Sequence, residues 1–361
     1  MLYVGVLAAF IISCGIVVYL TPKLLLLSLR KKIIDHIDGR KIHTAAASRL
    51  GGFSFFPAIF LSVCLSIGIM CLFDQQICLE NITIKFVLGF CSLFILYILG
   101  VTDDIVSVRY RKKFVFQIIA ALLIVFSGTW IKSLHGFLGI GQLPDLIGIV
   151  LTVILLVFIM NSINLIDGID GLASLLSILA LWIYGTLFLS RFAIVDSLLA
   201  FAALGALVPF FYFNVFKVSR KNDSKIFMGD AGSLVIGFML GVMAIELWNM
   251  EIPNGNRPYP YILAYTMLFI PCFDAVRVAL FRVKDHKSMF LPDNNHIHHN
   301  LIGRGFSQRQ ALLIIVLGEV GCLFLNIFLT GYLNITFIVL IDILFIILFF
   351  KVVKYKAPVK K

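Results

Sequence analysis

Long apolar runs divide this sequence from one end to the other. A helix needs roughly 20 residues to cross the hydrocarbon core of a bilayer, and about eleven runs approach that length. We therefore predict an all-α polytopic membrane protein, a bundle of about 11 transmembrane helices. The runs cover residues 2–22, 51–72, 84–101, 114–131, 143–160, 171–190, 193–213, 228–248, 259–280, 311–330 and 333–350.

The composition supports the same class of protein. Of the 361 residues, 61% are hydrophobic and 14% are charged, and the mean hydropathy is +1.03. Soluble domains are about 45–50% apolar and about 25% charged. The first run is not followed by a small-residue cleavage site, so we expect it to be a retained helix. No polar stretch is long enough to bury a core, and we predict a single integral membrane domain over residues 1–361.

The distribution of basic residues predicts how the chain is oriented. Lys and Arg are enriched in the cytoplasmic loops of membrane proteins. Most of the 30 Lys and Arg residues follow the first, third, seventh and ninth runs or lie in the C-terminal tail. We predict a periplasmic N-terminus, a cytoplasmic C-terminus and an active site in cytoplasmic loops. The net charge of +11 then faces anionic membrane lipid. We expect no nucleic acid partner, because the charge is spread over membrane loops.

Two adjacent acids directly follow the third apolar run, in "LGVTDDIVSVRYRKKFVFQ". Asp103 and Asp104 would repel each other, so a cation or a basic partner is expected nearby. A solvated helix end, balanced by the basic residues from Arg109 to Lys113, explains the pair equally well. The motif alone therefore leaves both interpretations open.

The stretch "NSINLIDGIDGLAS", residues 161–174, carries Asp167 and Asp170 but no Lys or Arg. It lies in a predicted cytoplasmic loop, directly after an apolar run. A charged side chain at such a position is energetically costly unless it is paired or takes part in function. In a substrate site, the partner of these carboxylates would arrive with the substrate.

A third acid, Asp230, lies between two glycines in "SKIFMGDAGSLVIGF". Glycines allow close backbone approach, and a helix N-terminus offers free N–H groups to an anion. A simple N-cap would also explain Asp230. Capping would not explain the apolar Phe227 and Met228 that face the same small loop.

Three of the seven histidines fall within four positions of "FLPDNNHIHHNLIGRGFSQRQ". A zinc site is one interpretation, but no Cys is close by. We favour a cluster that contacts phosphate oxygens over a solvated loop. The three residues are His296, His298 and His299.

Carboxylates, glycines, histidines and basic residues thus converge on one membrane face. Mg²⁺ takes carboxylate and phosphate oxygens and keeps several waters, and basic groups neutralise the remaining phosphate charge. The combination favours a magnesium–diphosphate site where a lipid substrate can meet a soluble nucleotide.

These motifs resemble those of the polyprenyl-phosphate N-acetylhexosamine-1-phosphate transferases of glycosyltransferase family 4. This family starts bacterial O-antigen (lipopolysaccharide), enterobacterial common antigen and wall teichoic acid synthesis. The resemblance implies transfer of sugar-1-phosphate from a UDP-N-acetylhexosamine, by default UDP-GlcNAc, to undecaprenyl phosphate, which releases UMP. It also implies a Mg²⁺ cofactor, which Mn²⁺ could replace. It implies a location in the bacterial inner membrane and is compatible with a homodimer. The matching motifs are "VTDDIVSVRYRKKFVFQ", "NSINLIDGIDGLAS", "IFMGDAGS" and "PDNNHIHHNLIGRGFSQRQA".

The resemblance implies a metal-binding role for one residue and catalytic roles for four. Asp230 resembles the magnesium ligand. Asp103 and Asp104 resemble the pair near the phosphates, one of which is proposed to deprotonate or bind the lipid phosphate. Lys113 matches the basic residue that follows this pair, and Asp167 matches a polar residue near the metal and the phosphates.

The resemblance also implies substrate-binding roles. Asn164 matches a second polar residue near the metal–phosphate site. Asp170 matches the group that recognises uracil, and Phe227 matches an aromatic side chain that stacks on it. The histidines near the diphosphate correspond to His296, His298 and His299.

The first cytoplasmic motif of the family resembles "GRKIHTAAASRLGG", residues 39–52. It assigns Arg40, Lys41 and Arg49 to substrate binding, although Ser48 stands where a Pro is common.

Two further features bear on the branch and the pattern of the family. The order "HIHH", rather than three consecutive His followed by an acid, favours the branch that uses simple UDP-sugars. The family commonly has an Asn about ten residues before the metal ligand. Here Asn214 and Asn222 both approximate this position, and the sequence leaves the choice open.

A secondary transporter is the main alternative, and an inactive scaffold of the same fold is a weaker one. Glu319 and Asp342 lie inside the last two apolar runs, and buried acids often mark ion pathways. We favour interhelical hydrogen bonding for both, because neither has polar company at its depth. All the acidic positions of the motifs are present, which argues against an inactive scaffold.

Overall fold

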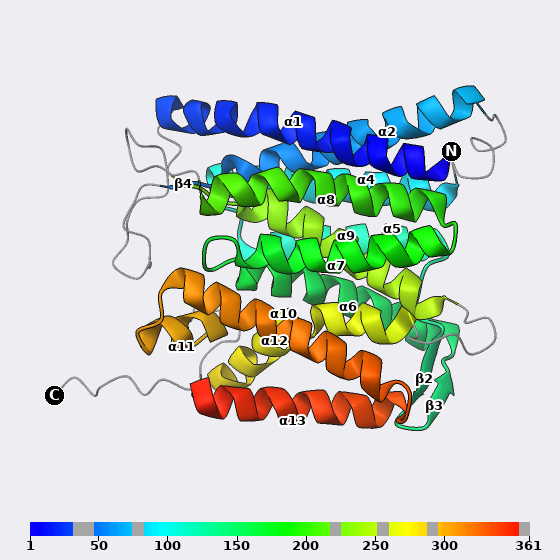
Figure 1. The fold of residues 1–361 in the computed structure, drawn as a ribbon, viewed down its shortest axis with the longest axis vertical. Helices are drawn as coiled ribbons and strands as arrows, with labels where there is room; N and C mark the ends of the chain where they lie inside the picture. Colours follow the sequence, from blue (N-terminus) through cyan, green and yellow to red (C-terminus); the bar gives the residue numbers. More distant parts are fainter. Residues whose placement is uncertain (32–46, 74–82, 217–224, 251–259, 287–294, 354–361) are drawn as a thin grey trace.

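The structure, a computed structural model, describes residues 1–31, 47–73, 83–216, 225–250, 260–286 and 295–353. Eleven long helices of these residues lie side by side, from α1 at one edge of the molecule to α13 at the other (Figure 1). They are α1 (Leu2–Lys31), α2 (Phe55–Phe73), α4 (Ile84–Val106), α5 (Tyr110–Phe126), α6 (Asp145–Ile166), α7 (Leu172–Ser190), α8 (Ile194–Val215), α9 (Gly229–Asn249), α10 (Pro260–Lys284), α12 (Gln308–Leu329) and α13 (Ile335–Val353). A short 3₁₀ helix η1 (Leu50–Ser54) precedes α2, and a short helix α11 (Ile297–Gly303) precedes α12.

Each predicted apolar run coincides with one of these helices. Within the described residues, nine helices are long and apolar enough to cross a membrane, so the chain is a multi-pass membrane protein. The two others are α5, with 17 residues, and α13, with 19. Helix α1 continues to Lys31, past the predicted residue 22, whereas α5 is displaced as a whole, predicted over 114–131 and observed over 110–126. The helix ends there because Gly128 adopts a left-handed φ of +96°.

Four short strands depart from the purely helical prediction. Strands β2 (Ser133–Phe137) and β3 (Ile140–Gln142) form an antiparallel hairpin between α5 and α6. Strand β1 (Ala47–Ser48) pairs in parallel with β4 (Lys225–Ile226). The hairpin and β4 lie at opposite ends of the helices (Figure 1). Open strand edges can exist there because water, absent from the hydrocarbon core, can bond their backbone groups.

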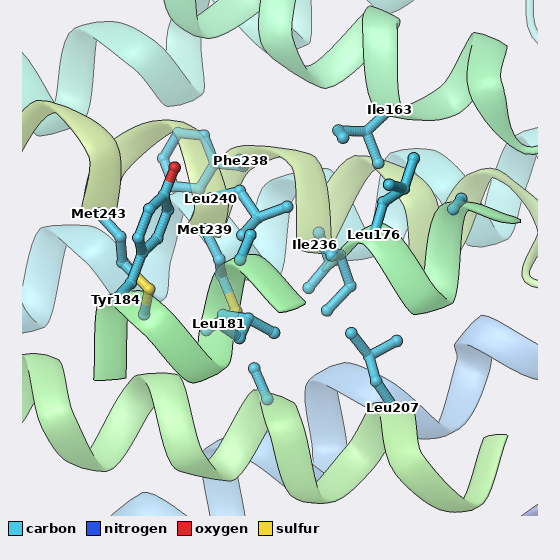
Figure 2. Close-up of a cluster of buried hydrophobic side chains, with 14 of the residues drawn as sticks. Ile163, Leu176, Leu181, Tyr184, Leu207, Ile236, Phe238, Met239, Leu240 and Met243 are labelled. Atoms are coloured by element: carbon cyan, nitrogen blue, oxygen red, sulfur yellow. The ribbon is translucent and has the colours of Figure 1, made fainter. Parts of the chain in front are cut away.

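Helix α9 lies at the centre of the bundle. Of its most apolar 18-residue window, 83% is buried, the largest share among the nine candidate spans. Side chains of α6, α7 and α8 surround it (Figure 2). Because lipid tails are as apolar as these side chains, close packing rather than the hydrophobic effect holds the helices together. The labelled side chains are Ile163, Leu176, Leu181, Tyr184, Leu207, Ile236, Phe238, Met239, Leu240 and Met243.

The two acids within the last apolar runs are both buried. Asp342 on α13 accepts hydrogen bonds from Tyr265 on α10 and, at 2.8 Å, from Asn326 Nδ2 on α12. The expectation that Asp342 lacks polar company is therefore wrong, because two other helices bring partners to its depth. The prediction of interhelical hydrogen bonding is confirmed for this residue.

Candidate active site

The candidate site forms where the ends of α4 and α6 meet the starts of α5 and α9, at the β4 end of the bundle (Figure 1). Helix α4 continues past the predicted residue 101, so Asp103 and Asp104 lie in its last turn. Helix α6 continues past residue 160 and includes Asn161 and Asn164. The expected loop is thus partly helical. Its polar side chains find partners on other helices, such as Gln117 Oε1, which lies 2.9 Å from Asn161 Nδ2.

Lys113 connects three of the helices. Its ammonium group forms ion pairs with Asp103 Oδ2, at 2.5 Å, and with Asp230 Oδ2. The other oxygen of Asp230 accepts a hydrogen bond from Asn164 Nδ2 at 2.9 Å. Asn164 also donates to Ser233 Oγ at 2.8 Å. Four residues predicted from three separate motifs are therefore joined in one chain of direct contacts, and the basic residue that balances the aspartate pair is Lys113.

Asp104 has a different environment from its neighbour. Its two oxygens accept hydrogen bonds from the backbone N–H groups of Asp230 and Ala231, each at 2.9 Å. A carboxylate at this position stabilises the positive end of the α9 dipole. Asp230 itself is in the first turn of α9 and is not its N-cap, which is Met228. The capping interpretation of Asp230 is therefore wrong, because Asp104 supplies the acceptor.

Gly229 permits this close approach. It has a left-handed φ of +67°. A Cβ atom there would lie 2.3 Å from the carbonyl oxygen of Arg49 and 2.6 Å from Asp104 Oδ2. The positive charge of Arg49 also acts on the Asp104 carboxylate. Arg49 therefore lies beside the site, whereas Arg40 and Lys41 are outside the described residues.

Asp167 follows the last residue of α6 and lies just outside the apolar segment. It makes no hydrogen bond or ion pair with any residue in the described ranges. Burial is the main cause that raises the pKa of its carboxyl group, and together with the negative charges of Asp170, Asp230 and Asp104 it brings this pKa to about 7. Near neutral pH, Asp167 is thus an acid poised to gain a cationic partner.

Asp170 is paired within the protein. Its Oδ2 forms an ion pair with Lys225 on β4. The expectation that both acids of this stretch await a partner from the substrate is therefore wrong for Asp170. The basic residue comes from a strand 55 positions later in the chain. No periodic pattern in the sequence links these two positions.

Asn214 holds the turn that follows Asp170. Its Oδ1 accepts a hydrogen bond from the backbone N–H of Gly171 at 2.6 Å, and its Nδ2 donates to the carbonyl oxygen of Ile226 at 2.7 Å. The same side chain therefore fixes the acidic turn and β4. Asn222, the other candidate for the family position, is outside the described residues.

Phe227 is fixed through its backbone. Its N–H donates to the carbonyl oxygen of Ser48 at 2.7 Å, and its carbonyl oxygen accepts from Gly51 at 3.0 Å. Phe227 comes two residues after Lys225, so this strand carries it to the neighbourhood of Asp170. The first cytoplasmic motif and the "IFMGDAGS" motif are thus joined by backbone hydrogen bonds.

The histidine motif is held by a buried acid that the sequence did not single out. Asp274 Oδ2 lies 2.9 Å from His296 Nδ1, and Asp274 Oδ1 accepts from the backbone N–H of Ile297 at 3.1 Å. Arg277 Nη2 also donates to Asp274 Oδ1, at 2.8 Å. The i, i+3 spacing of Asp274 and Arg277 was the one available signal for this pair.

His298 links the histidine motif to the acidic turn. It is buried, and a Cβ atom on Gly168 would lie 2.1 Å from its Nε2 atom. The His299 ring centroid lies 4.3 Å from that of His298. Among the described residues, no group of three or more His, Cys, Asp or Glu could hold a metal ion by itself. The zinc interpretation therefore has no support in this part of the chain.

Comparison with known proteins agrees with this geometry. The family model for glycosyl transferase family 4 matches residues 86–248. A Pasteurella multocida protein named undecaprenyl-phosphate alpha-N-acetylglucosaminyl 1-phosphate transferase is 32% identical over 294 residues, covering 80% of this chain and 77% of that protein. A Bacillus subtilis protein, named a probable undecaprenyl-phosphate N-acetylglucosaminyl 1-phosphate transferase, is 27% identical over 319 residues, covering 87% and 82%.

The fold and the site thus define a polytopic membrane glycosyltransferase with an acidic site at one end of its helices. The chain belongs to the polyprenyl-phosphate N-acetylhexosamine-1-phosphate transferase family.

Asp274→Asn tests how the histidine motif is held. The amide offers one acceptor oxygen where the carboxylate offered two, so we expect the free energy of unfolding to fall by about 1–3 kcal/mol. His296 should also become more reactive toward diethyl pyrocarbonate, as measured by peptide mass spectrometry. Asp145→Asn, an exposed residue at the opposite end of the bundle, serves as the control. Unchanged His296 reactivity would show that Asp274 does not hold the ring.

Asp167→Asn tests the raised pKa. Because the folded pKa of about 7 lies above the ordinary value of 3.8, the protonated carboxyl stabilises the fold at low pH. This stability is lost as the pH rises through 7. We compare the two metal-free proteins between pH 5 and pH 8. The free energy of unfolding of the wild type should fall by roughly 1 kcal/mol or more beyond the fall seen in the variant. Thermal unfolding at each pH measures this; parallel curves for the two proteins would contradict it.

Proposed function

We propose that the chain transfers N-acetylglucosamine-1-phosphate from UDP-GlcNAc to undecaprenyl phosphate, forming undecaprenyl-diphospho-GlcNAc and UMP. The names of the relatives support this acceptor and this sugar. The observation that carries the proposal is the contact of Lys113 with Asp103 and Asp230, next to the carboxyl of Asp167, which has no partner among the residues that the structure describes. Such a cluster can hold the phosphates of two substrates together. The product would start the synthesis of a cell-envelope polysaccharide.

We further propose Mg²⁺ as the cofactor, with Mn²⁺ as a substitute. The donor set fits, because Mg²⁺ in phosphate sites takes one or two carboxylates, substrate phosphates and water. The ammonium of Lys113 already lies between Asp103 and Asp230, so this space accommodates a positive charge. Asp230 would be the protein ligand, with Asn164 orienting its second oxygen. The ion would supply charge neutralisation for the diphosphate.

The reaction requires positioning more than proton transfer. An oxygen of the acceptor phosphate attacks the β-phosphorus of the UDP-sugar, and the bond from this phosphorus to the bridging oxygen of UMP breaks. A phosphomonoester has a second pKa of about 6, so it is already a dianion near neutral pH. The ammonium group of Lys113 would hold the phosphates in position and neutralise part of their charge. Asp103 and Asp104 need not act as bases, and the two hydrogen bonds of Asp104 favour a role in holding α9.

The nucleotide would bind on the side of Asp167 where Asp170 and Phe227 lie. Asp170 is a hydrogen-bond acceptor for uracil, held in place by Lys225, and Phe227 would stack on the base. The histidine motif, adjacent to Gly168, would contact the diphosphate. Arg49 would add positive charge on the β1 side. Arg40 and Lys41, which lie outside the described residues, stay predicted substrate-binding residues.

The wider setting of the enzyme is part of the proposal. Eleven transmembrane spans, including α5 and α13, would place the N-terminus in the periplasm and the C-terminus in the cytoplasm. Helix α1 begins at the end of the bundle opposite to that at which α13 ends, as an odd number of spans requires (Figure 1). We infer that the enzyme lies in the bacterial inner membrane, where it meets its lipid acceptor, and that it is compatible with a homodimer.

An activity assay tests the proposed function. Purified protein is incubated with undecaprenyl phosphate, Mg²⁺ and UDP-GlcNAc, and UMP release is measured; UDP-GalNAc and UDP-N-acetylfucosamine complete the panel. We expect UMP with UDP-GlcNAc, arrest by EDTA and restoration by Mg²⁺. Asp230→Ala should reduce turnover by about 100-fold or more. Glu319→Gln, which removes a buried acid that a transporter would use, should leave turnover intact. No UMP from any sugar would refute the transferase.

Two substitutions separate the roles within the acidic stretch. Asp167→Asn should mainly lower kcat, because Asp167 is the site acid that has no partner within the described part of the chain. Asp170→Asn should mainly raise KM for the UDP-sugar, because it weakens recognition of uracil. Steady-state kinetics on both variants measure the split. Equal effects of the two changes on kcat and KM would disprove this division even in an active enzyme.

A further inference from the structure

A groove of ≈ 730 Å³ runs along the outer surface between α4 and α5, outside the candidate site. Its apolar wall includes Phe94, Ile98 and Val106 of α4 and Phe116 of α5. These four side chains are between 44% and 72% exposed. The groove is therefore an open, lipid-facing surface of the described structure, and its length and charge indicate what it binds.

The length of the groove matches one leaflet of a bilayer. From Phe94 to Val106, α4 rises by about 18 Å, at 1.5 Å per residue. The hydrocarbon core is about 30 Å thick, so one leaflet contributes about 15 Å. The wall thus offers space for an acyl chain that extends from the membrane surface to the midplane. A long polyprenyl chain would exceed it.

The end of the groove nearest the candidate site is basic. Arg109 and Lys112 line it, both are exposed, and no Asp or Glu is among the lining residues. The cavity at the opposite end of the bundle differs, because there Lys85 forms ion pairs with Asp196 at 3.1 Å and Glu246 at 3.0 Å. Among the described residues, no acid forms an ion pair with Arg109 or Lys112, so the α4–α5 groove presents positive charge at its mouth. Basic pockets between transmembrane helices on the cytoplasmic side attract anionic lipid head groups.

The groove is separate from the reacting groups. Asp103, Lys113 and Asp230 do not line it. A hydrogen bond connects the two regions: Val108, a lining residue, donates its backbone N–H to Asp103 Oδ1 at 2.6 Å. A phosphate held by Arg109 and Lys112 would thus lie next to the α4–α5 turn without entering the site. This geometry disfavours the acceptor lipid as the occupant, since its phosphate must reach the reacting groups.

We propose that the α4–α5 groove binds an anionic glycerophospholipid, with its phosphate on Arg109 and Lys112 and an acyl chain along Phe94 to Val106. Binding needs neither the sugar nucleotide nor turnover. The bound lipid would hold the turn that carries Val108 and thereby the hydrogen bond to Asp103.

Native mass spectrometry of the purified protein with phosphatidylglycerol or phosphatidylcholine tests this proposal. We expect retention of phosphatidylglycerol in preference to phosphatidylcholine. Arg109→Gln/Lys112→Gln should weaken phosphatidylglycerol binding by roughly 30-fold, the combined effect of two basic residues near an anionic lipid. Ile98→Trp should block the groove and reduce binding while leaving the charges in place. Arg30→Gln/Lys31→Gln removes the same charge from the exposed end of α1 and should change nothing.

Several results would overturn the proposal. One is equal loss of binding in the α4–α5 and α1 variants, which would indicate only a general charge effect. Another is displacement of phosphatidylglycerol by undecaprenyl phosphate in wild type but not in Ile98→Trp, which would assign the groove to the acceptor. A third is a cross-link between Ile98→Cys residues of two copies, which would assign it to a dimer. Lipid binding without any UMP release would refute the transferase and leave this site standing.

Discussion

The cost of charge in hydrocarbon is the constraint on which the rest of this structure depends. An unpaired charge or an unsatisfied backbone group is energetically costly in the bilayer core, and this chain satisfies its backbone groups there by forming helices. Polar residues therefore gather at helix ends, where water, partners or substrates can satisfy them. One buried acid within the spans follows the same rule: Asp342 is hydrogen-bonded across three helices. A site for two phosphorylated substrates can thus form only at an end of the bundle.

The candidate site is built from helix ends more than from loops. Lys113 joins α5 to α4 and α9 through Asp103 and Asp230, and Asn164 adds α6. Asp104 stabilises the start of α9 by accepting hydrogen bonds from two of its free backbone N–H groups. Rigid helices thereby position the acidic groups, which suits a reaction that depends on bringing two anions together. The adjacent aspartates, alike in sequence, have different partners because successive residues on a helix point in different directions.

Much of the fold could be predicted because membrane helices require long apolar runs. The ends of those runs were less predictable. Helices α4 and α6 continue through polar residues such as Asp103 and Asn164, since partners on other helices satisfy them. The partners Lys225 and Asp274 were missed, because each lies far along the chain from the residue it holds: 55 positions from Asp170 and 22 from His296.

The sequence by itself determined a multi-pass membrane helical protein, its family, and the motifs that supply the site. Apolar run length and short-range motifs encode these properties locally. The tertiary structure alone decided that Lys113 bridges Asp103 and Asp230, that Asp170 is already paired with Lys225, and that Asp167 lacks a partner among the described residues. These distinctions depend on which helix ends meet in space. Packing of whole helices fixes that arrangement, and no local pattern records it.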